Sequence, residues 1–120
     1  MKHIGHSHGR NEDARLLRGR GRYLDDVELP GQQHAAFVRS TEAHALVRSV
    51  DVSGALSRRG VSAALTADDL PASIKPAPSM WQPEGTEVLV PEWYPLASDR
   101  VACVGAPIAV VIAGDRYTAE

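Results

Sequence analysis

The feature that most constrains the fold of this chain is an uninterrupted aliphatic run at residues 108–113, Ile-Ala-Val-Val-Ile-Ala. Successive side chains of a strand point to opposite faces of a sheet, so a strand without polar positions is expected to be buried on both faces. A similar run at residues 101–104 precedes it across a short connector. Both runs are far shorter than the ~20 apolar residues of a membrane span. They predict two closing strands of a sheet and no membrane segment.

Shorter segments upstream alternate between strand and helix patterns. Strands are predicted at residues 35–40, 45–52 and 61–66, the first buried on both faces. Short helices are predicted from their capping residues: Asn11 before a helix that Gly19 ends, Ser53 before a helix that Gly60 ends, and Asp115 before residues 116–120. Thr66 to Asp69 has the spacing of a capping box, and residues 29–32 fit a type II turn. The alternation indicates an α+β architecture with a small mixed sheet and short helices.

Residues 71–95 differ from the rest of the chain because they hold six of the eight prolines and both tryptophans. Proline cannot donate to a strand ladder, so the segment is predicted to be an extended excursion. Trp81 and Trp93 have two open interpretations: they cover the core, or they anchor a partner, as tryptophan often does at interfaces.

Composition excludes several classes of protein. Thirteen basic against fifteen acidic residues give a net charge of −2, which argues against electrostatic binding of nucleic acid. A lone cysteine, Cys103, excludes an internal disulfide, and its apolar neighbours predict a buried thiol in mid-strand. The first residues lack the apolar core of a secretory signal, so a cytoplasmic location is expected.

No constellation of residues predicts catalysis or a cofactor site. The pairs Asp25-Asp26 and Asp68-Asp69 diverge on any regular backbone and suit turns and caps. His34 and His44 lie in or beside predicted strands and are interpreted as packed or surface histidines before general bases. His3, His6 and His8 could hold Cu(II) or Ni(II), but a solvated polar leader is the favoured interpretation.

A short basic stretch has two interpretations. Arg20 and Arg22, beside Tyr23, could grip a phosphate or stack on a base. The flanking acidic residues make local salt bridges the favoured use of both arginines.

A long series of ordered motifs resembles the molybdenum hydroxylase large subunits, the family of the xanthine dehydrogenases, aldehyde oxidases and aerobic carbon monoxide dehydrogenases. The most extensive motif is residues 12–26, Glu-Asp-x-Arg-Leu-Leu-x-Gly-Arg-Gly-Arg-Tyr-x-Asp-Asp. Further matching segments are residues 29–31, 34–40, 43–45, 51–56, 60–61, 65–70, 94–97, 99–101 and 104–113. Ala14 and Arg18 depart from the family, which often has proline and threonine there, and residues 71–93 have no match.

This resemblance implies an α/β hammerhead domain from a much larger enzyme. Such an enzyme hydroxylates a carbon centre, or oxidises carbon monoxide, with oxygen from water, and passes electrons from a molybdopterin cofactor to Fe–S clusters and FAD on partner subunits. The pterin-binding segments and the catalytic glutamate of the family lie downstream of the matched stretch. No catalytic, cofactor-binding or metal-binding role therefore transfers to a numbered residue of this chain.

We therefore expect a flexible leader at residues 1–10 and a hammerhead domain at residues 11–120, truncated at its C-terminus and not catalytic alone. The expected partners are the remaining domains of the large subunit and its Fe–S and FAD subunits. The residues predicted to contact them are Arg20, Arg22, Tyr23, Trp81 and Trp93. The alternative is a stand-alone, non-catalytic interaction module with the same fold.

Overall fold

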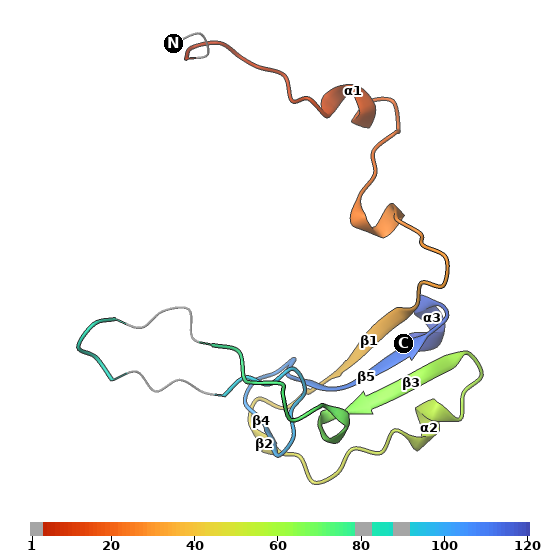
Figure 1. Ribbon diagram of the computed structural model, residues 1–120, viewed down its shortest axis with the longest axis vertical. Helices are drawn as coiled ribbons and strands as arrows, with labels where there is room; N and C mark the ends of the chain where they lie inside the picture. The colour runs from red at the N-terminus through yellow and green to blue at the C-terminus, as the bar shows by residue number, and fades with distance from the viewer. Residues whose placement is uncertain (1–3, 79–82, 88–91) are drawn as a thin grey trace. The chain divides into compact units, whose positions relative to one another are not determined.

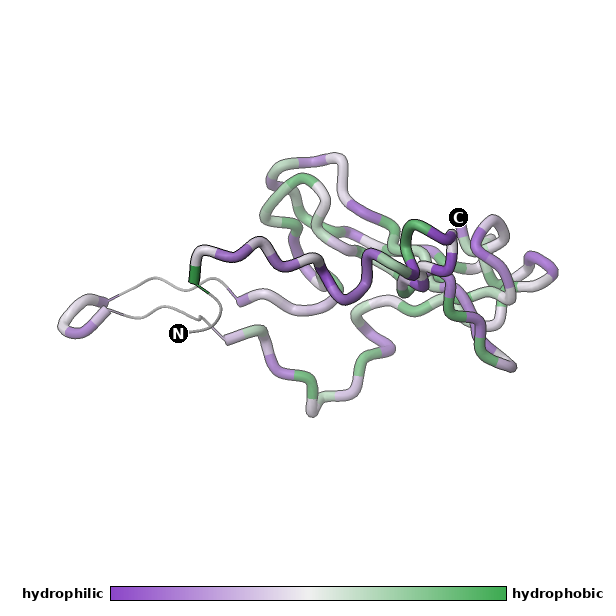
Figure 2. Tube along the Cα trace, turned by 90° about the horizontal axis from the view of Figure 1, so that it is seen from above, coloured by the Kyte–Doolittle hydropathy of each residue, from purple (hydrophilic) through white to green (hydrophobic). Residues whose placement is uncertain are grey.

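The computed structural model describes residues 4–78, 83–87 and 92–120. The chain forms two compact units, Met1–Gln32 and Gln33–Glu120. Hydrophobic positions are concentrated in the second unit, which contains every strand (Figure 2). Within the described residues, no helix has the length and apolar character needed to cross a bilayer.

The first unit contains α1 (Asp13–Leu16) and the single 3-10 turn η1 (Leu24–Asp26). The prediction that Asn11 caps the first helix is wrong, because Glu12 occupies the N-cap position and no side chain caps the helix. The turn signals of this unit are confirmed. Gly19 and Gly31 have φ angles of 66° and 77°, and the N–H of Gln32 donates to the carbonyl of Leu29 at 3.0 Å, as a type II turn requires.

The second unit is built around a three-stranded sheet in the order β1-β5-β3 (Figure 1). The strands are β1 (His34–Arg39), β3 (Val61–Thr66) and β5 (Pro107–Ala113). The aliphatic run at residues 108–113 forms a strand, as predicted, and the pairing places that strand at the centre of the sheet. Every pairing given for the described residues is antiparallel, whereas the sequence led us to expect a mixed sheet.

Burial in the sheet corrects one prediction. Strand β1 lies at an edge and is largely exposed, so the expectation that residues 35–40 are buried on both faces is wrong. In β5 the side chains alternate between buried and half-buried positions along the strand. The central strand therefore has one well-covered face and one that is covered less.

A two-residue ribbon pairs β2 (Ala45–Leu46) with β4 (Arg100–Val101), at the opposite end of the sheet from α3 (Figure 1). Both strands are shorter than the predicted strands at residues 45–52 and 100–104. Cys103 is half-buried in the turn after β4, not in mid-strand, because the chain reverses at Gly105, whose φ angle is 86°. The N–H of Ala106 donates to the Cys103 carbonyl at 3.2 Å and closes this turn.

Short helices α2 (Ser53–Leu56) and α3 (Arg116–Ala119) and the 3-10 turn η2 (Ala67–Asp69) connect the strands. Ser53 is the first residue of α2 and not its cap. Its N–H instead donates to Oδ1 of Asp51 at 2.9 Å. The other two capping predictions are confirmed: Asp69 accepts the N–H of Thr66 at 2.7 Å, and Asp115 accepts the N–H of Thr118 at 2.9 Å.

The core of the described residues is made mainly of small side chains. Its buried hydrophobic members are Ala64, Leu96, Val101, Ala106, Ala109, Val111, Ala113 and Ala119. Five of the eight are alanines, and no large side chain is completely buried. Because hydrophobic stabilisation scales with the apolar area removed from water, such a core contributes little for a domain of this length.

Candidate functional site

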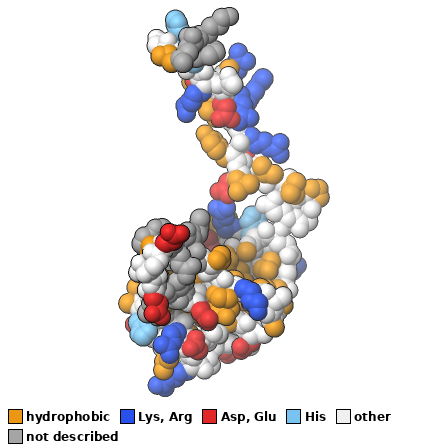
Figure 3. Space-filling model, turned by 60° about the vertical axis from the view of Figure 1, so that its left-hand side comes forward, with side chains coloured by type: hydrophobic (Ala, Val, Ile, Leu, Met, Phe, Trp, Pro, Cys, Tyr) orange, Lys and Arg blue, Asp and Glu red, His pale blue; other side chains and the backbone are white. Residues whose placement is uncertain are grey.

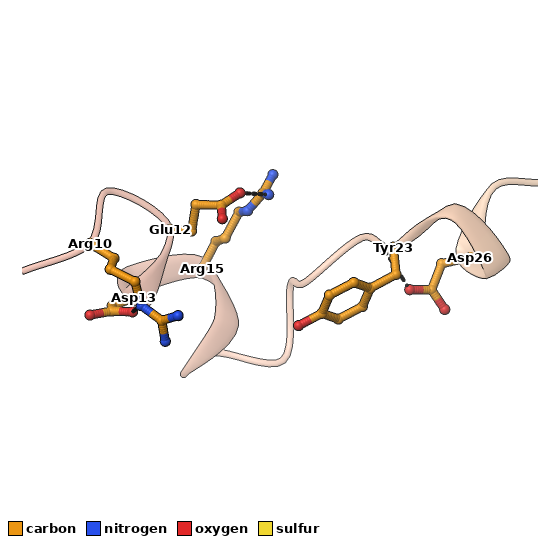
Figure 4. A network of polar contacts seen from close by, with 6 residues as sticks. All are labelled: Arg10, Glu12, Asp13, Arg15, Tyr23 and Asp26. Carbon is orange, nitrogen blue, oxygen red and sulfur yellow. Dashed lines mark hydrogen bonds and ion pairs between the residues drawn. The ribbon is translucent and has the colours of Figure 1, made fainter. Parts of the chain in front are cut away.

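The predicted contact residues of the first unit are exposed on a loop between α1 and η1. Arg20, Arg22 and Tyr23 are all exposed, and the Tyr23 N–H donates to Oδ2 of Asp26 at 2.8 Å (Figure 4). A Cβ atom built on Gly21 would lie 2.8 Å from Cδ2 of Leu16 and 3.7 Å from Cε2 of Tyr23. The absence of a side chain at this glycine therefore lets the helix and the loop pack closely.

The local salt bridges of this unit involve other arginines than predicted. Arg10 pairs with Asp13 at 3.1 Å, and Arg15 pairs with Glu12. Both pairs have the i,i+3 spacing that brings side chains together on a helical turn (Figure 4). Within residues 4–32 neither Arg20 nor Arg22 forms an ion pair, so the favoured salt-bridge interpretation is wrong for both arginines.

In the second unit, a groove of about 530 Å³ forms where the excursion returns to the sheet. Trp93 and Tyr94 line it together with the adjacent ion pair of Asp99 and Arg100, whose charged atoms are 3.5 Å apart. The N–H of Ala77 donates to the Trp93 carbonyl at 2.8 Å and joins the two limbs of the excursion. The groove therefore combines two partly exposed aromatic rings with a polar rim, as protein contact sites commonly do.

The sequence predicted only part of this groove. Trp93 lines it and Trp81 falls outside the described residues; the contact role of each tryptophan stays a prediction. Tyr94 was missed, although its position directly after a tryptophan was the available signal. A second groove of about 520 Å³ was also missed; it lies between α2, α3 and the sheet and includes Ala55, Arg58 and Tyr117.

Three aspartates have perturbed pKa values for structural reasons. Hydrogen bonds from the backbone and hydroxyl of Ser53 and of Thr66 hold the pKa values of Asp51 and Asp69 below the ordinary value. The Thr118 hydroxyl, 2.6 Å from Oδ2, and then its N–H lower the pKa of Asp115 in the same way. Stabilised carboxylates of this kind are poor general bases, and their hydrogen bonds to residues two or three positions away explain them as parts of turns and caps.

Across residues 4–78, 83–87 and 92–120, no three His, Cys, Asp or Glu side chains gather closely enough to hold a metal ion. His34 is half-buried and His44 is exposed. His3, the key ligand of the leader hypothesis, lies outside the described part of the chain.

A small α+β domain with exposed contact grooves is the class that this fold and these surfaces define. Residues 18–120 match the family described as "Aldehyde oxidase and xanthine dehydrogenase, a/b hammerhead domain". The chain belongs to this hammerhead family, which confirms the fold expected from the sequence.

Two similar proteins are much longer than this chain. The chain is 41% identical over 117 residues to the nicotine 6-hydroxylase large subunit of Paenarthrobacter nicotinovorans, covering 98% of this chain and 14% of that protein. It is 39% identical over 120 residues to the carbon monoxide dehydrogenase large chain of Afipia carboxidovorans, covering 99% of this chain and 14% of that one. The chain thus spans about one-seventh of these relatives.

Solved structures agree with the sequence comparison. Quinoline 2-oxidoreductase from Pseudomonas putida superimposes with a TM-score of 0.86 at 38% identity, covering 97% of this chain and 14% of that chain. The carbon monoxide reduced state of Cu,Mo-CO dehydrogenase superimposes with a TM-score of 0.81 at 39% identity, covering 96% and 14%.

Proposed function

We propose that this chain is the N-terminal structural domain of the large subunit of a molybdopterin-dependent hydroxylase or dehydrogenase. The observation that carries the proposal is its match, along almost its whole length, to one-seventh of large-subunit relatives. The enzyme would oxidise its substrate with oxygen from water. Residues 1–10 would form a leader, residues 11–120 the hammerhead domain, and the location would be cytoplasmic.

The described residues do not fit the molybdopterin cofactor itself. A cofactor of this kind needs a concave site with several convergent hydrogen-bonding groups. In the groove at Trp93, Asp99 and Arg100 pair with each other, and their side chains are 75% and 55% exposed. The cofactor would therefore be held by other domains of the subunit, and the chemistry would occur there.

The contribution of this chain would be to pack against those domains. Arg20 and Arg22, which form no ion pair within residues 4–32, suit carboxylates or backbone carbonyls of a neighbour. Tyr23, Trp81 and Trp93 would supply aromatic contacts. The Fe–S and FAD subunits of the complex would be the further partners.

Metal analysis tests this assignment. The purified 120-residue chain and the full-length large subunit, both produced in a host that makes the cofactor, are compared by elemental mass spectrometry. Molybdenum is expected in the full-length subunit and absent from the 120-residue chain. Stoichiometric molybdenum in the short chain would contradict the placement of the cofactor elsewhere.

A stand-alone interaction module remains the second candidate, because the exposed groove at Trp93 suits a separate protein partner equally well. The coding frame after Glu120 separates the two. A frame that continues into glycine-rich pterin-binding motifs supports the large subunit, and a native stop codon supports the module.

A further inference from the structure

The register of the sheet divides its side chains between two faces. Opposite one another across β1, β5 and β3 lie Ala36, Val111 and Ala64 on one face, and Phe37, Val110 and Leu65 on the other. Ala35, Ile112 and Ala63 form a second row on the latter face. We call the face of these last six residues the open face, and the opposite one the helix-covered face.

The helices pack on the helix-covered face. Residues of α2 and α3 line the same groove as Ala36, Val38 and Val111, and Phe37, on the edge strand β1, also borders this groove. On this face of β5, Ala109, Val111 and Ala113 are at most 9% exposed. Helix α3 also contacts both β1 and β5.

The open face is apolar and incompletely covered. All six of its residues are hydrophobic; Ala35 and Phe37 are exposed and the other four are half-buried. Figure 3 shows hydrophobic side chains gathered at the surface of this unit. The cation next to the open face, Arg39, is already engaged, since it donates to the Gly105 carbonyl at 2.9 Å and lies 5.5 Å from the centre of the Phe37 ring.

We propose that the open face is a docking surface for an apolar surface of another domain of the same polypeptide. This inference rests on the proposed function. The relatives supply the occupant, because about six-sevenths of each one lies outside the stretch that this chain matches. The occupant is apolar because the six residues offer it no charge and no side-chain hydrogen bond.

The size of the open face favours a covalently linked occupant over a second copy of the chain. Separate proteins usually need about 20–30 residues a side for a stable interface. Six residues, four of them already half-buried, fall well short of that. A linked domain is present at an effective concentration in the millimolar range, so a small patch is enough to hold it.

Adjacent residues of β1 offer a matched test. Phe37 and Val38 are each 50% exposed but lie on opposite faces. Phe37→Cys and Val38→Cys are made in the 120-residue chain and in the full-length subunit, and reaction with a maleimide is timed by peptide mass spectrometry. On going to the full-length subunit, labelling of Phe37→Cys is expected to slow at least about tenfold and that of Val38→Cys by less than about threefold.

A second measurement needs no substitution. Phe37 is the single phenylalanine of the chain, so its oxidation by hydroxyl radicals can be followed in the wild-type protein. Equal reactivity of Phe37 in the short and full-length proteins would overturn the inference. Equal protection of positions 37 and 38 would overturn the assignment to one face, and protection in the short chain that grows with concentration would identify a second copy instead.

The intact mass of the natural protein distinguishes failure of the proposed function from failure of this inference. If the natural product has the intact mass of the 120-residue chain alone, the proposed function fails and this inference fails with it. If the product is long and Phe37 still reacts freely, only this inference fails.

Discussion

Replacing Leu96 with alanine tests whether the few large core residues hold the second unit together. Leu96 is 2% exposed and is one of three buried hydrophobic side chains larger than alanine among the described residues. The next residue, Ala97, donates its N–H to the Pro107 carbonyl at 2.8 Å, where β5 begins. This hydrogen bond joins the returning limb of the excursion to the central strand, and the buried Leu96 is the residue next to that junction.

The expected loss is large relative to the stability available. Truncating a fully buried leucine to alanine costs about 2–5 kcal/mol, because apolar contact is lost and a cavity remains. Typical domains have about 0.05–0.15 kcal/mol of stability per residue. A unit spanning Gln33–Glu120 would then have roughly 4–13 kcal/mol, of which Leu96→Ala removes a substantial part.

Urea unfolding of the 120-residue chain, followed by tryptophan fluorescence and circular dichroism, measures the effect. Leu46, which is 70% exposed in β2, provides the matched control. Leu46→Ala is expected to change the free energy of unfolding by less than about 0.5 kcal/mol. If Leu96→Ala proves as mild as this control, with an unchanged dependence on urea, Leu96 is not a core anchor and the reasoning is wrong.

Three further predictions concern local features. Gly60 has a φ angle of 95°, and a Cβ there would lie 3.2 Å from Cγ2 of Thr118, so Gly60→Ala should lower the free energy of unfolding by roughly 1–2 kcal/mol in the same urea assay. Gly54→Ala, in open space within α2, should be neutral or stabilising, and an equal loss in both variants would contradict the argument. Because the pKa values of Asp51, Asp69 and Asp115 are lowered in the folded state, that state binds fewer protons than the unfolded chain. The three carboxylates therefore stabilise the fold above the ordinary pKa of 3.8, and this stabilisation is lost as the pH falls through their pKa values in the folded state. Thermal melts should show Tm falling below about pH 4, less steeply in Asp115→Asn, and a Tm independent of pH there would refute this linkage. The double substitution Arg20→Ala and Arg22→Ala should leave the melting of the short chain unchanged but weaken subunit assembly of the full-length protein on gel filtration; unaltered assembly would remove both arginines from the contact surface.

Turns and helix caps could be predicted from the sequence because each depends on only a few neighbouring residues. Gly19 and Gly31 lie in turns where expected, since only glycine adopts positive φ without strain. Gly60 also has positive φ, but α2 ends at Leu56, earlier than the predicted end at Gly60. Asp69 and Asp115 cap where their spacing predicted. The central strand followed from its unbroken aliphatic run.

The burial of strands and their pairing could not be predicted in the same way. A continuous apolar run predicts an apolar environment on both faces but does not say whether this chain or another supplies it, which is why β1 was mistaken for a buried strand. The length of β2 depends on its partner β4, which turns away before Cys103. Ion pairing of the arginines was misassigned because the helical i,i+3 spacing of Arg10 and Arg15 brings them to Asp13 and Glu12 first.

The same difference between local features and strand pairing explains which residues of the candidate surfaces could be predicted. Trp93 was found because a tryptophan in a proline-rich excursion is conspicuous in sequence, whereas Phe37 sits in an ordinary apolar run and shows its role only once the register assigns it to a face. Composition can locate unusual residues such as tryptophan, but only the pairing of strands shows which common apolar residues share a face of the sheet.

The distribution of side-chain size across the sheet links its stability to its surroundings. On the helix-covered face, alanines at positions 64, 109 and 113 let short helices approach closely but bury little apolar area. The larger groups, Phe37, Leu65, Val110 and Ile112, lie on the open face, where they remain partly in contact with water. At about 25 cal/mol per Å² of apolar surface removed from water, covering them stabilises the sheet further. The open face therefore couples folding of this domain to docking, so a partner surface that covers it should raise the Tm of the whole unit and not only that of its edge.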